Sequence, residues 1–225
     1  MAKVSLERRA QIGFAKRART RTAILEAARA CYAAPTGAPI TVDALMQEAG
    51  LAKGTFYVHF QDLAALEVEL AAALIDELDG RLQPARLAAD HPLTRLATAV
   101  GILLHDLASA PPRARLVARA LAAVPAVGDA MRAHLRQDLR AVRAEGLLAM
   151  GSVDLAALVV AGLCEQAVRE MGNGRIEKRA VPDIVRAVLR AIGCTPSDAA
   201  AYAEQAARHA KGFPQQKASS DGSRL

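Results

Sequence analysis

The hydrophobic residues of this 225-residue chain recur at helical spacing along most of its length, and no segment alternates apolar and polar residues as a strand would. After Asp62, for example, a leucine follows every fourth residue from Leu66 to Leu82. Alanine and leucine are abundant, and both favour helices. The pattern therefore predicts an all-α fold. Beyond residue 61, helices are expected at 62–82, 92–109, 112–124, 127–149, 153–171, 181–192 and 195–210.

Two short periodic segments, separated by a glycine, lie between Thr41 and Phe60. The Thr41 hydroxyl can accept hydrogen bonds from the first free N–H groups of a helix. Gly50 is placed to end this helix, because glycine enters the left-handed conformation freely. A second helix over residues 52–60 follows directly, which gives the helix–turn–helix layout of a DNA-reading element. The apolar face of the first helix consists of Val42, Leu45, Met46 and Ala49.

The second of these helices has two faces of different chemistry. Phe56 and Phe60 lie four residues apart and are expected in the core, since both rings would otherwise be exposed to water. The opposite side carries Gly54, which would allow close approach to a partner, beside a cation, hydroxyls and an imidazole. Such groups suit a phosphate-lined DNA groove. The candidate DNA contacts are Thr41, Lys53, Gly54, Thr55, Tyr57, Val58 and His59.

Residues 20–66 resemble the N-terminal region of the TetR family of bacterial transcriptional regulators. The matching positions are TAILEAA at 22–28, Tyr32, Gly37, TVD at 41–43, AGL at 49–51, KGTFYVHF at 53–60 and Leu66. Leu63 departs from the family pattern, which usually has a phosphate-contacting lysine there. The resemblance implies a three-helix DNA-binding domain followed by a larger helical domain that binds an effector and dimerises.

These observations divide the chain into four parts. A basic N-terminal arm is expected over residues 1–19 and the helix-turn-helix DNA-binding domain over 20–66. The helical effector-binding and dimerisation domain follows over 67–211. Residues 212–225 have the composition of a disordered tail.

Positive charge is concentrated at the N-terminus. Residues 1–21 contain seven basic side chains and one acidic one, so they account for the whole net charge of +6. An arm of this kind would contact phosphates or enter the minor groove, with Arg19 and Arg21 as the candidates beside the first helix. The alternative is a disordered leader that only increases solubility.

The expected effector domain contains no Phe, Tyr or Trp between residues 67 and 201. A pocket there could not stack a planar ring or enclose a quaternary ammonium group with aromatic faces. We therefore expect an aliphatic effector, or one held mainly by polar contacts. The candidate polar groups are His105, His134 and Gln166, and the alternative for each is a solvated or core position without ligand contact.

The segment 153–171 is apolar over more than one helical face, which a helix exposed to water on one side would not need. By the resemblance, this helix and the one at 181–192 pair with their copies in a four-helix bundle, which implies a homodimer. The alternative is a helix buried within its own chain. The candidate interface residues are Leu155, Leu158, Val159, Gly162, Leu163, Val185 and Leu189.

Other kinds of site have little support in the sequence. Cys31, Cys164 and Cys194 are far apart without a CxxC or Cys/His cluster, so core packing is expected rather than a metal site, a disulfide or a redox sensor. Neither a nucleophile elbow nor a glycine-rich cofactor loop occurs, so we expect neither catalysis nor a cofactor. The charged N-terminus and the absence of a long uncharged stretch predict a cytoplasmic protein without membrane contact.

The sequence thus predicts a ligand-responsive regulator of transcription. It would bind a palindromic operator in double-stranded DNA as a homodimer, act as a repressor and be released by a small molecule. The alternative is a DNA-binding architectural or adaptor protein that is controlled by a protein partner, and such a protein would need no cavity of ligand size.

Overall fold

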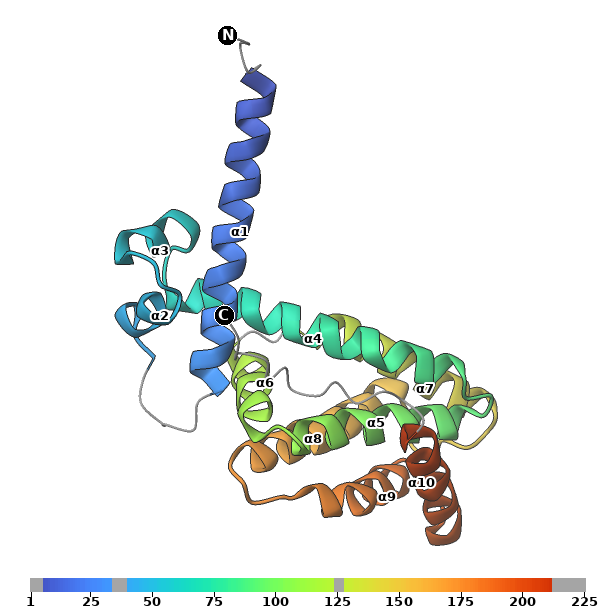
Figure 1. Ribbon diagram of the computed structural model, residues 1–225. Helices are drawn as coiled ribbons and strands as arrows, with labels where there is room; N and C mark the ends of the chain where they lie inside the picture. Colours follow the sequence, from blue (N-terminus) through green and yellow to red (C-terminus); the bar gives the residue numbers. More distant parts are fainter. Residues whose placement is uncertain (1–5, 34–39, 124–127, 212–225) are drawn as a thin grey trace. The chain divides into compact units, whose positions relative to one another are not determined.

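The structure is a computed structural model that describes residues 6–33, 40–123 and 128–211. These residues form α-helices with short 3₁₀ segments, and no strand occurs among them, which confirms the predicted all-α fold (Figure 1). Gly37, the first five residues of the expected arm and the expected tail at 212–225 lie outside the described residues.

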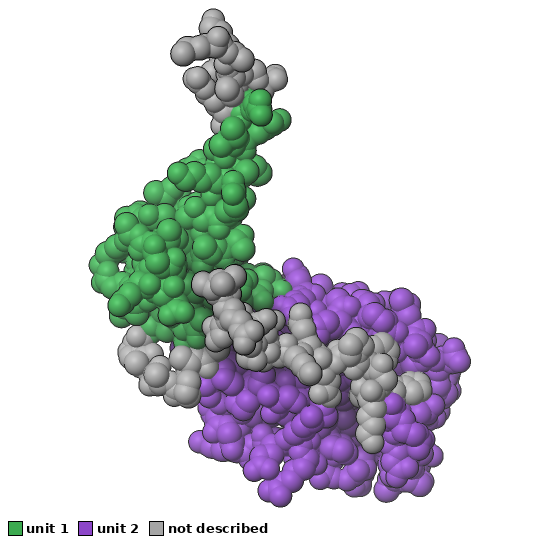
Figure 2. Space-filling view, in the orientation of Figure 1, with its two compact units in different colours: residues 1–73 green, residues 74–225 purple. Residues whose placement is uncertain are grey.

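The chain divides into two compact units, residues 1–73 and residues 74–225 (Figure 2). The division falls within helix α4, Leu63–Leu87, whose first part belongs to one unit and whose remainder belongs to the other. The domain boundary expected after residue 66 also falls within this helix. Pro84 lies inside α4, which continues through it to Leu87.

The first unit contains α1, Leu6–Ala33, α2, Val42–Glu48, and α3, Lys53–His59, together with the start of α4. Apolar residues at three- and four-residue spacing give each of these helices a face to bury. Together the faces form one small core. Its fully buried side chains include Ile24, Leu45, Met46, Phe56, Leu66 and Leu70.

Helix α1 begins farther towards the N-terminus than the sequence pattern indicated. It starts at Leu6, so most of the segment expected as a separate arm belongs to a continuous helix. The arginines, lysine and alanines of this segment are good helix formers, and they extend a helix that the core already holds at Ile24 and Ala28. Residues 11–19 are exposed throughout.

The second unit is a helical bundle formed by the remainder of α4 and six further helices. These are α5, Pro92–Ala108, α6, Pro111–Ala123, α7, Asp129–Ala144, α8, Val153–Gly172, α9, Val181–Ala191, and α10, Pro196–Lys211. Helix α5 is central, because it contacts each of α6 to α10. Leu96, Leu104 and Leu107 on this helix are accordingly among the most deeply buried side chains. Helix α7 ends before the predicted residue 149, because Gly146 follows it with a φ of 72°.

Candidate functional site

The turn between α2 and α3 is fixed by local hydrogen bonds that the sequence encodes. Thr41 caps α2, and its hydroxyl accepts from the Ala44 N–H at 3.2 Å. At the other end, Gly50 has a φ of 64°, which favours glycine. The Leu51 N–H then donates to the Met46 carbonyl at 2.9 Å and closes the turn. Helix α3 therefore begins at a position set by its own neighbours in the chain.

The two faces of α3 differ in burial as the sequence predicted. Phe56 is fully buried and Phe60 is almost so, whereas the side chains of Tyr57 and Val58 are 57% and 58% exposed. Gly54 is exposed, and a Cβ added there would have no atom within 4 Å. The short helix thus presents an open surface with an aromatic ring and an aliphatic side chain in water. Lys53 is also exposed on it, and Thr55 and His59 are half-buried.

Lys53 at the start of α3 forms an ion pair across the turn. Its Nζ lies 2.9 Å from Oδ2 of Asp43, and this hydrogen bond is the main cause that raises the pKa of Lys53 above its usual value. Both side chains are more than half exposed, so water and salt screen the pair strongly. A phosphate that approached Lys53 would compete with a single exposed carboxylate.

Arg21 has a different position from the one expected of a phosphate contact. Its guanidinium donates to both carboxylate oxygens of Glu69 and, at 2.7 Å, to the backbone carbonyl of His59. It also lies 4.4 Å from the centre of the Phe60 ring. The nitrogens that would bind a phosphate are thus bonded within the first unit, and this geometry favours a role in positioning the end of α3.

Other basic residues of α1 remain accessible to a partner. The side chains of Arg8, Lys16, Arg17 and Arg19 are exposed, and Arg19 donates only a long bond of 3.4 Å to the Ala15 carbonyl of its own helix. The helix therefore presents cations beyond the core of the first unit. Whether they contact DNA stays a prediction.

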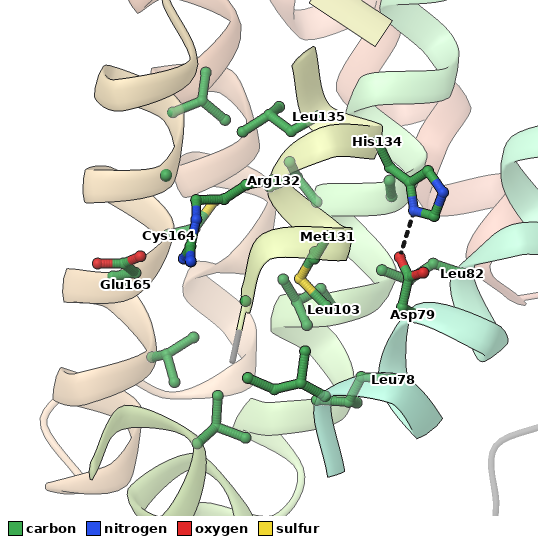
Figure 3. A pocket seen from close by; sticks show the side chains of 18 of the residues that line it. Leu78, Asp79, Leu82, Leu103, Met131, Arg132, His134, Leu135, Cys164 and Glu165 are labelled. Carbon is green, nitrogen blue, oxygen red and sulfur yellow. Dashed lines mark hydrogen bonds and ion pairs between the residues drawn. The ribbon is translucent and has the colours of Figure 1, made fainter. Parts of the chain in front are cut away.

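The second unit contains a cavity of about 110 Å³ formed by α4, α5, α6, α7 and α8 (Figure 3). Most of its wall is aliphatic, and none of the described residues that line it is Phe, Tyr or Trp. A cavity of this composition favours an apolar ligand whose few polar groups are matched by polar side chains. The aliphatic wall includes Leu78, Leu82, Leu103, Met131, Leu135 and Val160.

Among the three polar residues predicted for the ligand, only His134 lines this cavity. His105 lines a separate depression, beside Lys178 and Val185. Gln166 is exposed on α8, and its amide donates to Glu170 at 3.1 Å. These two positions are therefore not part of the site that His134 belongs to.

The structure adds charged residues to the cavity wall that the sequence analysis did not single out. Asp79 accepts from Nδ1 of His134 at 3.0 Å, and Glu165 and Arg132 also line the cavity. Asp79 follows Leu78 directly on the apolar side of α4. An acidic residue in that position is the sequence signal that could have identified it as a site residue. The signal for Glu165, next to Cys164, was of the same kind.

A buried ion pair closes one side of the same cavity. Arg86 lies 2.9 Å from Asp138, and the side chains are 8% and 3% exposed. Arg86 also donates to the His134 carbonyl at 3.1 Å. Breaking one partner of such a pair leaves a buried charge uncompensated, so this pair holds α4 to α7 rather than offering a binding group.

Helix α8 carries a row of exposed apolar side chains at helical spacing. Leu158 is 70% exposed, and Leu155 and Leu163 are exposed beside it, with Gly162 and the half-buried Val159 completing the row. The other two residues predicted for a dimer interface differ. Val185 and Leu189 on α9 are buried in the core of the second unit, so they are not available to a second copy.

All three cysteines are free, and burial raises the pKa of the Cys164 thiol to about 12, so it stays protonated and unreactive at neutral pH. The described residues include no group of three or more metal-ligating side chains. They also contain no helix that is both long enough and apolar enough to cross a membrane.

No protein-family model matches the sequence, and no curated protein matches it. Solved structures are nevertheless similar to most of the chain. RolR in complex with resorcinol has 19% sequence identity and a TM-score of 0.62, and the similarity covers 84% of this chain and 94% of RolR. FadR from Bacillus subtilis in complex with stearoyl-CoA has 16% sequence identity and a TM-score of 0.64, and the similarity covers 75% of this chain and 97% of FadR. A TetR-like transcriptional regulator from Rhodococcus sp. RHA1 has 18% sequence identity and a TM-score of 0.55, and the similarity covers 86% of this chain and 96% of the regulator. The chain therefore has the fold of TetR-like transcriptional regulators.

Proposed function

We propose that this protein is a transcriptional regulator of the TetR family that binds a palindromic operator in double-stranded DNA and is released from it by a small molecule. Helix α3 carries the proposal. Tyr57 and Val58 are more than half exposed on it, while Phe56 is fully buried on the opposite face. Packing within the chain explains Phe56 but not the exposed pair, which a DNA groove would cover.

A homodimer would provide the second reading helix that a palindromic operator requires. The exposed row on α8 supports such a dimer, because its five residues form one continuous stripe that water covers in the single chain. Gly162 in this row would let a second helix approach closely. The dimer surface that we propose consists of Leu155, Leu158, Val159, Gly162 and Leu163, without the buried residues of α9.

Helix α4 provides a physical route between effector and DNA. Its Ile75, Leu78 and Asp79 line the cavity, and its first residue, Leu63, follows closely after α3. An effector that fits one position of α4 better than another would change the position of α3 and hence the fit of the dimer to DNA. A preference of about 1–3 kcal/mol is a typical coupling between two such sites.

The comparisons and the cavity support a small molecule as the controlling signal. The RolR and FadR structures of the same fold hold resorcinol and stearoyl-CoA. A DNA-binding adaptor controlled by a protein partner would need no cavity, whereas the second unit contains one with a largely aliphatic wall. We propose a repressor, because a bound dimer can block polymerase without any further surface.

DNA selection from genomic fragments, followed by affinity measurements at several salt concentrations, tests the proposal. We expect Lys53→Ala and Tyr57→Ala each to weaken binding to the selected DNA at least about tenfold, with unchanged thermal melting. Lys178→Ala is the matched control, since Lys178 is an exposed lysine of the second unit and should not matter. Wild-type protein without salt-dependent affinity for double-stranded DNA would refute the proposal.

A further inference from the structure

The charged groups that line the α4–α8 cavity do not balance. Three carboxylates, those of Asp79, Asp138 and Glu165, face two guanidinium groups, those of Arg86 and Arg132. A cavity with mostly aliphatic walls screens charge poorly, so an unmatched carboxylate there strongly favours a cation.

Both guanidinium groups are engaged within the protein. Arg86 and Asp138 form the buried pair described above, which neutralises one charge of each sign. Arg132 donates at 2.8 Å to Asp129, an exposed residue that does not line the cavity. An anionic ligand that approached Arg132 would therefore have to compete with the Asp129 carboxylate.

Asp79 and Glu165 are the carboxylates left without a guanidinium partner among the described residues. Asp79 is 14% exposed and is hydrogen-bonded to Nδ1 of His134, while Glu165 has no hydrogen bond or ion pair among the residues that the structure describes. Figure 3 shows them on opposite sides of Met131, Asp79 near Leu82 and Glu165 beside Cys164. The cavity thus offers a carboxylate at each side, with Met131 between them and the Arg132 guanidinium, which donates to Asp129, on the side of Glu165.

From this arrangement we infer that the cavity binds an aliphatic amine in its protonated form. The alkyl chain would lie against the aliphatic wall, and the ammonium group would donate to Asp79 or Glu165 in a charge-assisted hydrogen bond. A quaternary ammonium group could not donate, and the described residues of the cavity wall provide no aromatic face to bind such a cation. The inference rests on the proposed function only in taking this cavity as the effector site.

Titration calorimetry of the full-length protein without DNA tests the inference with three probes of equal chain length. These are octylamine, octanoate and 1-octanol, whose head groups are positively charged, negatively charged and neutral. We expect octylamine to bind at least about tenfold more tightly than octanoate, with 1-octanol between them. Equal or tighter binding of octanoate, or no saturable binding of octylamine, would overturn the inference.

Two variants identify the groups responsible. Asp79→Asn or Glu165→Gln, depending on which carboxylate holds the ammonium group, should weaken the binding of octylamine about tenfold and leave the binding of 1-octanol unchanged. Asp76→Asn is the matched control for Asp79, because Asp76 is exposed on α4 and does not line the cavity. Should Asp79→Asn fail to fold without its bond to His134, Glu165→Gln still provides the comparison. Unchanged octylamine binding in every cavity variant that folds would contradict the inference.

DNA affinity, measured separately on the same proteins, distinguishes the two proposals. Octylamine binding by a protein without DNA affinity would contradict the regulator and leave the amine site intact. DNA affinity combined with a preference for octanoate would contradict the amine site and leave the regulator intact.

Discussion

Arg21 on α1 and Glu69 on α4 form an ion pair with two hydrogen bonds beside the C-terminal end of α3. Two guanidinium nitrogens donate to the two carboxylate oxygens, and the third donates to the carbonyl of His59, the last residue of α3. The guanidinium also covers the Phe60 ring. One side chain therefore links three helices of the first unit at the point where α3 ends.

Removing Glu69 separates a structural role of Arg21 from a direct contact with phosphate. If Arg21 positions α3, Glu69→Ala should weaken DNA binding several-fold and lower the free energy of unfolding by less than about 1 kcal/mol, because the pair is more than a third exposed. If Arg21 instead contacts phosphate, the same variant frees a cation and strengthens binding. Fluorescence anisotropy with labelled DNA and urea unfolding measure the two effects.

Gly54 allows DNA binding to be tested apart from folding. A Cβ at this position meets no atom, and alanine favours a helix by up to about 1 kcal/mol over glycine. Gly54→Ala should therefore stabilise the free protein and weaken DNA binding about tenfold, because the added methyl group would lie in the groove. Gly80→Ala on α4, which is equally open, should stabilise without changing DNA affinity. Equal DNA affinity of Gly54→Ala and wild type would show that this face does not approach DNA closely.

Leu158 is the most exposed large residue of the proposed dimer surface. Leu158→Glu should produce monomers at micromolar concentration, because a carboxylate would be buried against its copy without a cation. Sedimentation velocity measures the change. Leu87→Glu, at an exposed leucine outside this surface, should sediment as wild type does. A dimer that survives Leu158→Glu would place the interface elsewhere.

Two histidines should make the protein less stable in mild acid. Burial, as the largest cause, lowers the pKa of both His59 and His105 below the usual value of about 6.5. The unfolded chain then binds more protons than the folded chain, so stability that is present above about pH 6.5 is lost as the pH falls below that value. His105→Gln should reduce the difference between the urea midpoints at pH 7.5 and pH 5.5. A midpoint difference identical to that of wild type would exclude His105 as a cause.

The α2–turn–α3 unit could be predicted from the sequence because its determinants are local. The Thr41 cap, the positive φ of Gly50 and the spacing of Phe56 and Phe60 each act within a few residues of the chain. The start of α1 was not predicted, because a run of cations supports an exposed helix as well as an unstructured arm.

The cavity and the dimer surface depend on how distant helices meet, which a periodic pattern does not specify. Val185 and Leu158 are both apolar residues on amphipathic helices, yet one is buried by α5 and its neighbours and the other is exposed. Asp79 and His134 are far apart in sequence and become partners only when α4 and α7 pack together. Neither the burial of these side chains nor the contact between Asp79 and His134 could be predicted from one segment of the sequence alone.

The uneven distribution of aromatic residues makes intrinsic fluorescence a useful probe of this protein. It has no tryptophan, and of its three tyrosines Tyr32 and Tyr57 belong to the first unit, with Tyr202 in the second. An aliphatic effector is itself non-fluorescent, so it leaves this emission unobscured. Docking of α3 onto a duplex would alter the emission of Tyr57 without any attached dye. A single tryptophan introduced into the chain would be the only source of tryptophan fluorescence.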